Sequence, residues 1–174
     1  MIILGIDPGS RLTGYGLIDN RRDRMIYCAS GHIRVRGDSF PQRLGDIFEQ
    51  LCAVIAEHQP VQMSIESVFM HKNADSALKL GQARGAAICA GHQAGLQIHE
   101  YAPREVKQAL VGRGAAEKEQ VRHMVMRLLG LTTEPQIDES DALALAICHA
   151  QHQMMENRTG LPASAFKNRR TRRR

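Results

Sequence analysis

The order of apolar segments along the chain is the feature that most constrains its fold. Three strand-like segments come first, at residues 1–7, 13–20 and 24–35, and the short link "RRD" between the last two predicts an antiparallel meander. Strand-like and helix-like segments then alternate. A meander followed by this alternation predicts an α/β fold in which helices cover the faces of a mixed sheet.

The spacing of apolar side chains separates the helices from the remaining strands. Residues 39–59 repeat apolar side chains every three or four positions, which is typical of an amphipathic helix, and Pro41 suits its first turn. Residues 61–67 ("VQMSIES") and 96–102 ("LQIHEYA") are short segments that we predict to be strands. Further helices are expected at residues 74–95, 104–112, 115–130 and 138–155.

Positive charge is concentrated at the end of the chain. The final eight residues, "KNRRTRRR", hold six of the 23 lysines and arginines and none of the 18 acids. We expect residues 1–156 to form one folded domain and residues 157–174 to form a basic, unfolded tail. Such a tail would add general affinity for phosphates, and a purely solubilising role is the alternative.

The composition excludes several classes of protein. No apolar run approaches the roughly 20 residues of a membrane helix, and the N-terminus lacks the pattern of a secretory signal. The widely spaced cysteines form no Cys-x-x-Cys pair, which favours reduced thiols over disulfides or a zinc site. We therefore expect a cytoplasmic protein that does not enter a membrane. The cysteines are Cys28, Cys52, Cys89 and Cys148.

Two acidic residues end predicted strands. Asp7 closes "MIILGID" and precedes a Pro-Gly turn, and Glu66 follows "MSI" directly before a loop. If the two strands are parallel neighbours, both carboxylates emerge at the same carboxyl edge, where open α/β sheets place their sites. The alternative for Asp7 is that it only shapes the turn.

A second pair of acids opens the last predicted helix. Asp138 and Asp141 lie three positions apart and so project from one face, although acids at a helix start often serve only as caps. Four converging carboxylates would repel one another unless cations lay among them, and Mg²⁺ prefers oxygen ligands. Two such ions about 4 Å apart can activate water in phosphodiester cleavage. The acids therefore predict a nuclease with two Mg²⁺ ions, for which Mn²⁺ could substitute.

Four sequence blocks carry a specific resemblance. They are "GIDPGSRLTGYG", "IESVFMHKNADSALKLGQARG", "APREVKQALVGRGAAEKEQV" and "DESDALALAICH". In this order, over about residues 2–150, they resemble the RuvC family of bacterial Holliday junction resolvases. The resemblance implies a ribonuclease H-like domain with a five-stranded mixed sheet, acting as a homodimer that makes paired nicks in four-way DNA junctions during homologous recombination and DNA repair. It also implies that branch-migration proteins of the RuvA and RuvB families are partners.

The resemblance assigns roles to individual residues. The family's metal-binding and catalytic acids fall on Asp7, Glu66, Asp138 and Asp141, although some relatives carry histidine at the third position. Three further residues match DNA-binding positions. Phe69, in a polar loop, would stack on an unpaired base, with anchoring of its own loop as the alternative. Lys107 and Lys118 would contact the DNA backbone, with a solvated helix face as the alternative.

Two further patterns lie on predicted helices. A stripe of small residues recurs every four positions on one helix, and tight packing on the protein's own sheet competes with a role in the dimer contact. His149 and His152 lie three positions apart, but no acid or cysteine partner completes a transition-metal site. We interpret them as ordinary helix-surface residues. The stripe consists of Ala77, Gly81, Gly85 and Cys89.

Rival functions follow from the same residues. A ribonuclease H or integrase-type nuclease would use the same metal chemistry on another substrate. A junction-binding protein without catalysis would not need the four acids. An actin-like ATPase also begins with a strand, an aspartate and a glycine turn, but it needs two such domains, and 174 residues leave room for one.

Overall fold

The computed structural model describes residues 1–22, 24–67 and 74–160. Elements expected from the sequence are present, with small shifts at their ends. The strands are β1 (Ile2–Asp7), β2 (Leu12–Arg21), β3 (Arg24–Arg34), β4 (Gln62–Glu66) and β5 (Gln97–Tyr101). The helices are α1 (Phe40–His58), α2 (Ala74–Gln93), α3 (Pro103–Val111), α4 (Lys118–Leu129) and α5 (Ile137–Thr159).

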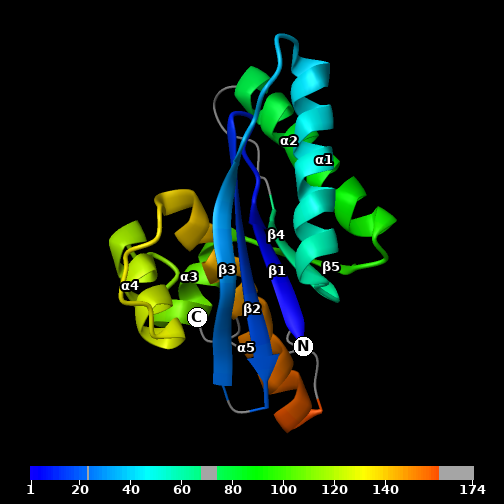
Figure 1. Cartoon of the computed structure of the whole chain (residues 1–174). Coiled ribbons are helices and arrows are strands. Elements are labelled where there is room, and N and C mark those ends of the chain that lie inside the picture. Colours follow the sequence, from blue (N-terminus) through cyan, green and yellow to red (C-terminus); the bar gives the residue numbers. More distant parts are fainter. Residues whose placement is uncertain (23, 68–73, 161–174) are drawn as a thin grey trace.

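The strands form one sheet in the order β3-β2-β1-β4-β5 (Figure 1). β2 runs antiparallel to β1 and β3, whereas β4 runs parallel to β1 and β5. The predicted five-stranded mixed sheet, an antiparallel meander joined to parallel strands, is confirmed. β1 is the central strand, and its residues from Ile3 to Ile6 are buried. Held by neighbours on both sides, it is a rigid support for whatever stands at its end.

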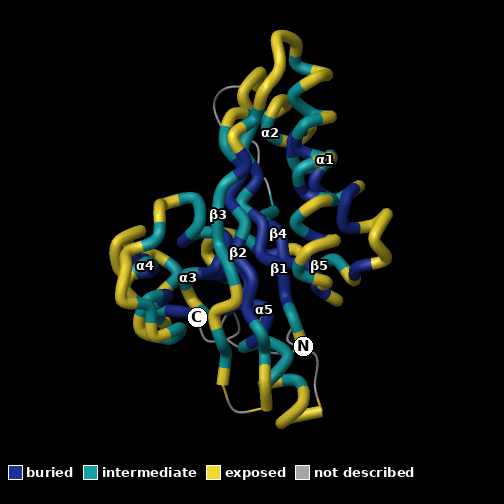
Figure 2. Tube along the Cα trace, viewed as in Figure 1, coloured by how far each residue is buried: buried dark blue, intermediate teal, exposed yellow. Residues whose placement is uncertain are grey.

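Helices cover both faces of the sheet (Figure 1). α1 and α2 pack on one face, where a core forms around residues such as Leu4, Ile6 and Ile47. α3, α4 and α5 pack on the other face, around residues such as Ile3 and Ile147. The buried segments of Figure 2 accordingly follow the middle strands and the helix faces turned toward them.

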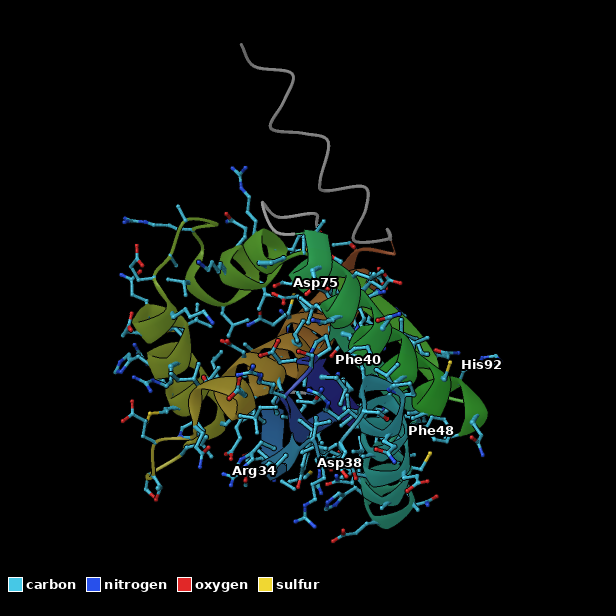
Figure 3. The ribbon with its side chains drawn as sticks, turned by 90° about the horizontal axis from the view of Figure 1, so that it is seen from above. Arg34, Asp38, Phe40, Phe48, Asp75 and His92 are labelled. Carbon is cyan, nitrogen blue, oxygen red and sulfur yellow. The ribbon has the colours of Figure 1, made fainter. Side chains whose placement is uncertain are left out.

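The view from above shows how the first layer is arranged (Figure 3). The labelled Phe40 and Phe48 lie along α1, and Asp75 and His92 mark the two ends of α2, so the two helices lie together on one side of the sheet. α1 packs against α2 through small side chains of α2, including the buried Ala83.

Local sequence sets the limits of α1. Ser39 caps its N-terminus by accepting a hydrogen bond from the Gln42 main chain at 3.4 Å, and the Gln42 side chain accepts one from the Ser39 N–H at 3.0 Å. This reciprocal pair satisfies two N–H groups that the helix leaves free, and Pro41 fits the first turn. The helix ends where Gln59 adopts a left-handed conformation with φ of 49°. The predicted helix over residues 39–59 is confirmed.

α5 is the central helix of the second layer. Ser140 and the residues from Ala142 to Ala150 are buried, because the sheet lies against one side of the helix and α3 and α4 against another. It sits almost on the main chain of the sheet. A Cβ at Gly5 would collide with the carbonyl oxygen of Ala142, and one at Gly16 would lie 2.7 Å from Leu143 Cγ. These glycines let the helix approach closely.

Burial explains why the interpretation of His149 as a surface residue is wrong. The His149 side chain is 2% exposed. Its Nε2 donates to Gln62 Oε1 at 3.1 Å, its Nδ1 accepts from the Tyr101 hydroxyl at 2.7 Å, and its ring stacks on His99 with centroids 4.1 Å apart. Burial together with the neighbouring His99 and His152 lowers the pKa of His149 to about 4, so the ring is neutral, with Nε2 as the donor to Gln62 and Nδ1 as the acceptor from Tyr101.

The end of α5 bears on the predicted domain boundary. The helix continues to Thr159, past the boundary expected after residue 156. The division into a nuclease domain and a tail stays a prediction, because residues 161–174 lie outside the described residues. None of the helices in the described part of the chain combines the length and apolar character needed to cross a membrane.

Candidate active site

Asp7 stands at the carboxyl end of the central strand, and the turn after it has a clear construction. The Gly9 N–H donates to the Thr13 hydroxyl at 3.2 Å, and that hydroxyl donates to the Gly9 carbonyl at 2.9 Å. A side chain on Gly9 would collide with the Leu12 carbonyl oxygen. Thr13 itself is fully buried. The turn is therefore closed by Thr13, which leaves the Asp7 carboxylate for another role.

Glu66 lies beside Asp7 because β1 and β4 are parallel neighbours. Ile6 pairs with Ile65 across the two strands, so the next residue of each strand is an acid at the same edge. This confirms that the two strands are parallel neighbours. The main chain after Glu66 is held on the other side, where the Ser67 N–H donates to the Tyr101 carbonyl at 2.9 Å.

Gly14 brings Asp138 to the same edge. Gly14 pairs directly with Asp7 in the sheet. A Cβ at Gly14 would collide with the Asp138 carbonyl oxygen and would lie 3.0 Å from the Asp138 Cβ. The first turn of α5 thus rests on the main chain of β2, next to Asp7. Gln136 is the N-cap of α5, so Asp138 lies inside the first turn and is not the capping residue.

Asp141 forms an ion pair with Lys118. Lys118 Nζ lies 2.8 Å from Asp141 Oδ2, and the lysine side chain is 66% exposed, compared with 27% for the aspartate. Lys118 is the first residue of α4. The structure therefore places this lysine, expected to contact the DNA backbone, at the rim of the carboxylate cluster. Its contact with DNA stays a prediction.

The four carboxylates interact electrostatically. Partial burial, followed in size by the charges of Asp141, Glu66 and Asp138, raises the pKa of Asp7 to about 8, and Lys118 opposes this. Burial and then Asp141 raise the pKa of Glu66, again against Lys118. Like charges in a partly desolvated site disfavour ionisation. The protein alone thus stabilises this cluster poorly in its fully charged state.

This poor stabilisation indicates a cation site. The ligands on offer are carboxylate oxygens, which suit hard divalent ions such as Mg²⁺ or Mn²⁺. Within the described ranges, no group of three or more His, Cys, Asp and Glu side chains is already spaced to hold a metal ion. One carboxylate, Asp141, is engaged by Lys118. The residues fit a divalent metal in chemistry and charge, and metal binding would have to draw the carboxylates together.

The other predicted site residues have different outcomes. Phe69 lies outside the described residues. Lys107 is half-buried on α3, and its role in DNA binding stays a prediction. The small-residue stripe faces outward: among the described residues, no atom outside the helix lies within 4 Å of a Cβ built at Gly81 or Gly85. Packing of these two positions on the protein's own sheet is therefore excluded.

Residues that were not predicted from the sequence also hold the acid-bearing segments in place. On β3, the Ser30 hydroxyl donates to Glu139 Oε2 at 3.2 Å, and His32 Nδ1 lies 3.4 Å from Glu139 Oε1. Glu139 follows Asp138 directly, so these contacts tie the start of α5 to the sheet. On the other side, Arg84 of α2 reaches the Glu66 main chain. The spacing of these residues in the sequence gives no signal of either contact.

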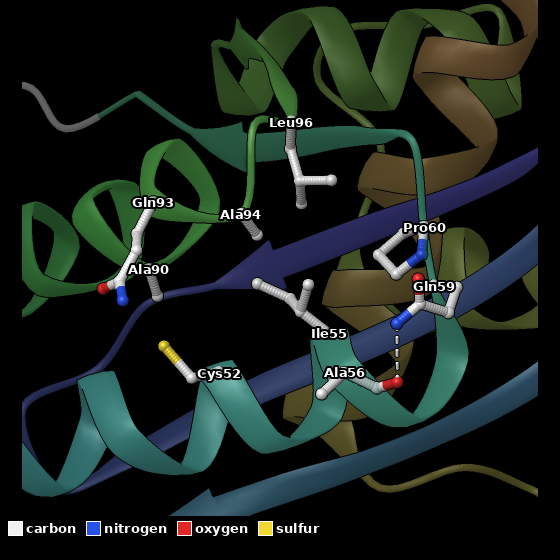
Figure 4. Close-up of a pocket in the computed structure, with 9 residues that line it drawn as sticks. All are labelled: Cys52, Ile55, Ala56, Gln59, Pro60, Ala90, Gln93, Ala94 and Leu96. Carbon is white, nitrogen blue, oxygen red and sulfur yellow. Dashed lines mark hydrogen bonds between the residues drawn. The ribbon is translucent and has the colours of Figure 1, made fainter.

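A pocket of about 310 Å³ lies at the end of the sheet remote from the carboxylates, where β4 and β5 begin (Figure 4). It opens between the C-terminal ends of α1 and α2, and Pro60 and Leu96, which line it, precede β4 and β5. Its lining residues include Cys52 and Ile55 but no charged side chain. Because it offers nothing to hold a phosphate or a cation, this pocket is unsuited to the chemistry that the carboxylates indicate.

The mixed sheet and the acids at its carboxyl edge define a nuclease of the ribonuclease H-like class. The family described as "Crossover junction endodeoxyribonuclease RuvC" matches residues 3–149 of this chain. The chain therefore belongs to the RuvC family, as the sequence blocks predict.

Individual relatives agree with this assignment. A crossover junction endodeoxyribonuclease RuvC of Methylococcus capsulatus is 56% identical over 156 residues, 90% of this chain and 94% of the relative. One of Pseudomonas fluorescens is 59% identical over 149 residues, 86% of each chain. The solved structure of Thermus thermophilus RuvC in complex with a Holliday junction substrate matches with a TM-score of 0.84 and 32% identity, covering 89% of this chain and 96% of that chain. The ribonuclease H-like fold is thus confirmed.

Proposed function

We propose that this protein resolves four-way DNA junctions by paired, symmetric nicks in homologous recombination and DNA repair. One observation carries the proposal: in a chain of the RuvC family, acids from β1, β4 and α5 lie at one edge of the sheet and influence one another's ionisation. A protein that only binds junctions has no use for this unfavourable concentration of negative charge.

We assign the metal ions to this cluster. Asp7, Glu66, Asp138 and Asp141 would hold two Mg²⁺ ions, or Mn²⁺ in their place. When bound, the ions supply activation of the attacking water and stabilisation of charge on the leaving oxygen. Asp7, on the most rigid strand, would fix the geometry of the site. Lys118 holds Asp141 and adds a positive charge at the exposed rim, where a DNA phosphate is attracted.

Two nicks in one encounter require two active sites. A four-way junction has approximate two-fold symmetry, which a homodimer with a matching axis would meet. The outward stripe of α2 is our candidate for part of the dimer contact, since small residues let another main chain approach. The open space over Gly81 and Gly85 supports this role.

The remaining DNA contacts and partners complete the proposal. Phe69 would stack on an unpaired base, and Lys107 would contact the DNA backbone together with Lys118. Residues 157–174 would form a basic tail after the nuclease domain of residues 1–156 and would add phosphate contacts. Proteins of the RuvA and RuvB families would be partners, and the protein would work in the cytoplasm.

The test compares substrates under one set of conditions. A four-way junction, a linear duplex of the same sequence and an RNA–DNA hybrid are incubated with protein and Mg²⁺, then with EDTA, and the products are resolved on a denaturing gel. We expect paired cuts in the junction only, none in EDTA, and binding with little cutting in Ca²⁺. Preferred cleavage of the hybrid would favour a ribonuclease H-type activity, and cleavage in EDTA would contradict the metal mechanism.

A further inference from the structure

Arg84 of α2 makes two contacts next to the site. Its Nε–H donates to the main-chain carbonyl of Glu66 at 2.9 Å, and its Nη2 forms an ion pair with Glu100 Oε2 at 2.6 Å. The Arg84 side chain is 18% exposed, whereas that of Glu100 is 56% exposed. One largely buried guanidinium therefore bridges the carboxyl ends of β4 and β5.

The position of this bridge matters because Glu66 has a strand neighbour on one side only. The pairing of β4 with β1 ends at Ile65, opposite Ile6. Glu66 still pairs with Tyr101 of β5, and Ser67 donates to the Tyr101 carbonyl. The Glu66 carbonyl receives its hydrogen bond from the helix layer, through Arg84. The main chain that carries this carboxylate is thus held by β5 from one direction and by Arg84 from another.

We propose that Arg84 is a positioning residue for Glu66. It contacts the carbonyl and not the carboxylate, so it fixes the direction in which the Glu66 side chain leaves the strand. The planar guanidinium suits this task because its donors have a fixed geometry, and the ion pair with Glu100 adds an electrostatic attraction at its other nitrogen. The inference rests on the proposed function, in which Glu66 holds a metal ion. Loss of a group that orients a metal ligand typically costs about 10–100-fold in metal affinity or activity.

The experiment uses the full chain and matched variants. Arg84→Gln removes both contacts, and Arg84→Lys keeps the positive charge and most of the packing but cannot bridge two partners with a rigid fork. Lys79→Gln is the control. It removes a positive charge from the same helix, where Lys79 pairs with the exposed Asp75 of that helix and not with Glu66 or Glu100.

Three measurements separate positioning from simple destabilisation. They are amide hydrogen exchange of Ser67 without metal or DNA, binding of Mn²⁺ followed by electron paramagnetic resonance, and the single-turnover rate of junction cleavage at saturating protein. For Arg84→Gln we expect several-fold faster exchange at Ser67, and Mn²⁺ affinity and cleavage rate each reduced about 10–100-fold. Junction affinity in Ca²⁺ should match that of Lys79→Gln. Arg84→Lys should be impaired in the same direction while unfolding at the wild-type urea concentration.

Each contrary result has a definite meaning. Ser67 exchange and Mn²⁺ affinity equal to those of Lys79→Gln would overturn the inference. So would a variant that loses junction affinity but cleaves normally at saturation, because Arg84 would then be a DNA contact. If the wild type cleaves no junction, the proposed function fails by itself, and the exchange and Mn²⁺ measurements still decide the role of Arg84.

Discussion

Glycines of this protein occur in two opposite environments. Gly5, Gly14 and Gly16 lie under α5, where an added Cβ would strike the helix. Gly81 and Gly85 lie on the outer side of α2, where a Cβ would meet no atom of the described residues beyond the helix itself. The first group is needed for internal packing, because it lets the helix that carries Asp138 and Asp141 pack closely on the sheet. The second group has no such use within the described chain, which is why we assign it to a partner surface.

The comparison predicts where substitutions are tolerated. Changes at the close-packed edge should remove catalysis, whereas changes on the open face of α2 should spare the fold and alter assembly. A residue type alone therefore says little about function until its surroundings are known.

The largest effect is expected from the carboxylates at the close-packed edge. Glu66→Gln keeps the size of the side chain and removes a charge that would hold metal. We expect the single-turnover cleavage rate to fall by several orders of magnitude, while junction affinity stays within a few-fold. Asp7→Asn, Asp138→Asn and Asp141→Asn should behave alike in the same assay. A full rate after Asp141→Asn would reduce that residue to a partner of Lys118.

A large effect is also expected from a single methyl group at Gly14. Gly14→Ala would push the first turn of α5 away from β2 and so move Asp138 relative to Asp7. Overpacking of this kind costs about 1–3 kcal/mol of unfolding free energy, and we expect the cleavage rate of the folded protein to fall as well.

Urea unfolding and single-turnover cleavage check this prediction. Gly45→Ala on α1, where a built Cβ has no atom within 4 Å from the described residues outside the helix, is the matched control and should stabilise the protein by roughly 0.5–1 kcal/mol. A Gly14→Ala protein with normal stability and rate would show that α5 does not need this close approach.

The open face of α2 should respond through assembly. Gly85→Leu adds a bulky side chain where the monomer has room, so the monomer should fold normally. We expect sedimentation to shift from dimer toward monomer, and junctions to be nicked singly instead of in pairs. Gly45→Leu, on an equally open glycine of α1, should leave the dimer intact. Paired cutting by a dimeric Gly85→Leu protein would place the interface elsewhere.

The smallest effect is expected from pH. Burial lowers the pKa of His149 to about 4 in the folded protein, against an ordinary value of about 6.5 in the unfolded chain. Between these values the unfolded state binds the extra proton, so this group makes the fold less stable as pH falls from about 6.5 toward 4. The neighbouring His99 and His152 also lower the pKa of His149, after burial in size.

A variant isolates this contribution from the acids. His149→Gln should destabilise the protein at pH 7, because it disturbs the bonds to Tyr101 and Gln62. The difference in unfolding free energy between the variant and the wild type should be smaller at pH 5. At that pH the neutral His149 lowers the unfolding free energy of the wild type, and the variant has no such group. Urea unfolding at the two pH values measures this difference, and an unchanged difference would contradict the prediction.

Much of the fold and part of the site could be predicted from the sequence. Apolar periodicity marked the strands and helices, and the Asp-Pro-Gly and Glu-Ser strand ends marked Asp7 and Glu66. Those signals are local, because a strand end and a turn are encoded within a few residues. The sequence blocks then supplied the family, which the comparisons confirm.

The rest depended on packing between distant segments. Local spacing put Asp138 and Asp141 on one face of a helix. Only the close packing of the first turn of α5 against Gly14 places that face beside Asp7. His149 is buried because α5 is covered on more than one side, which the polar His149 and His152 pair does not indicate. The ion pair of Lys118 joins residues 23 positions apart, and nothing in their spacing predicts it.

The length of α5 has a consequence for how this enzyme would meet DNA. A helix of 23 residues extends roughly 35 Å at 1.5 Å per residue. One end carries the acids, and the other ends at Gly160, toward the opposite edge of the sheet (Figure 1). The proposed basic tail is joined to the end of this helix that is remote from the acids. If that tail contacts phosphates as proposed, added salt should weaken binding of the protein to DNA more than it slows the cleavage step at saturating protein.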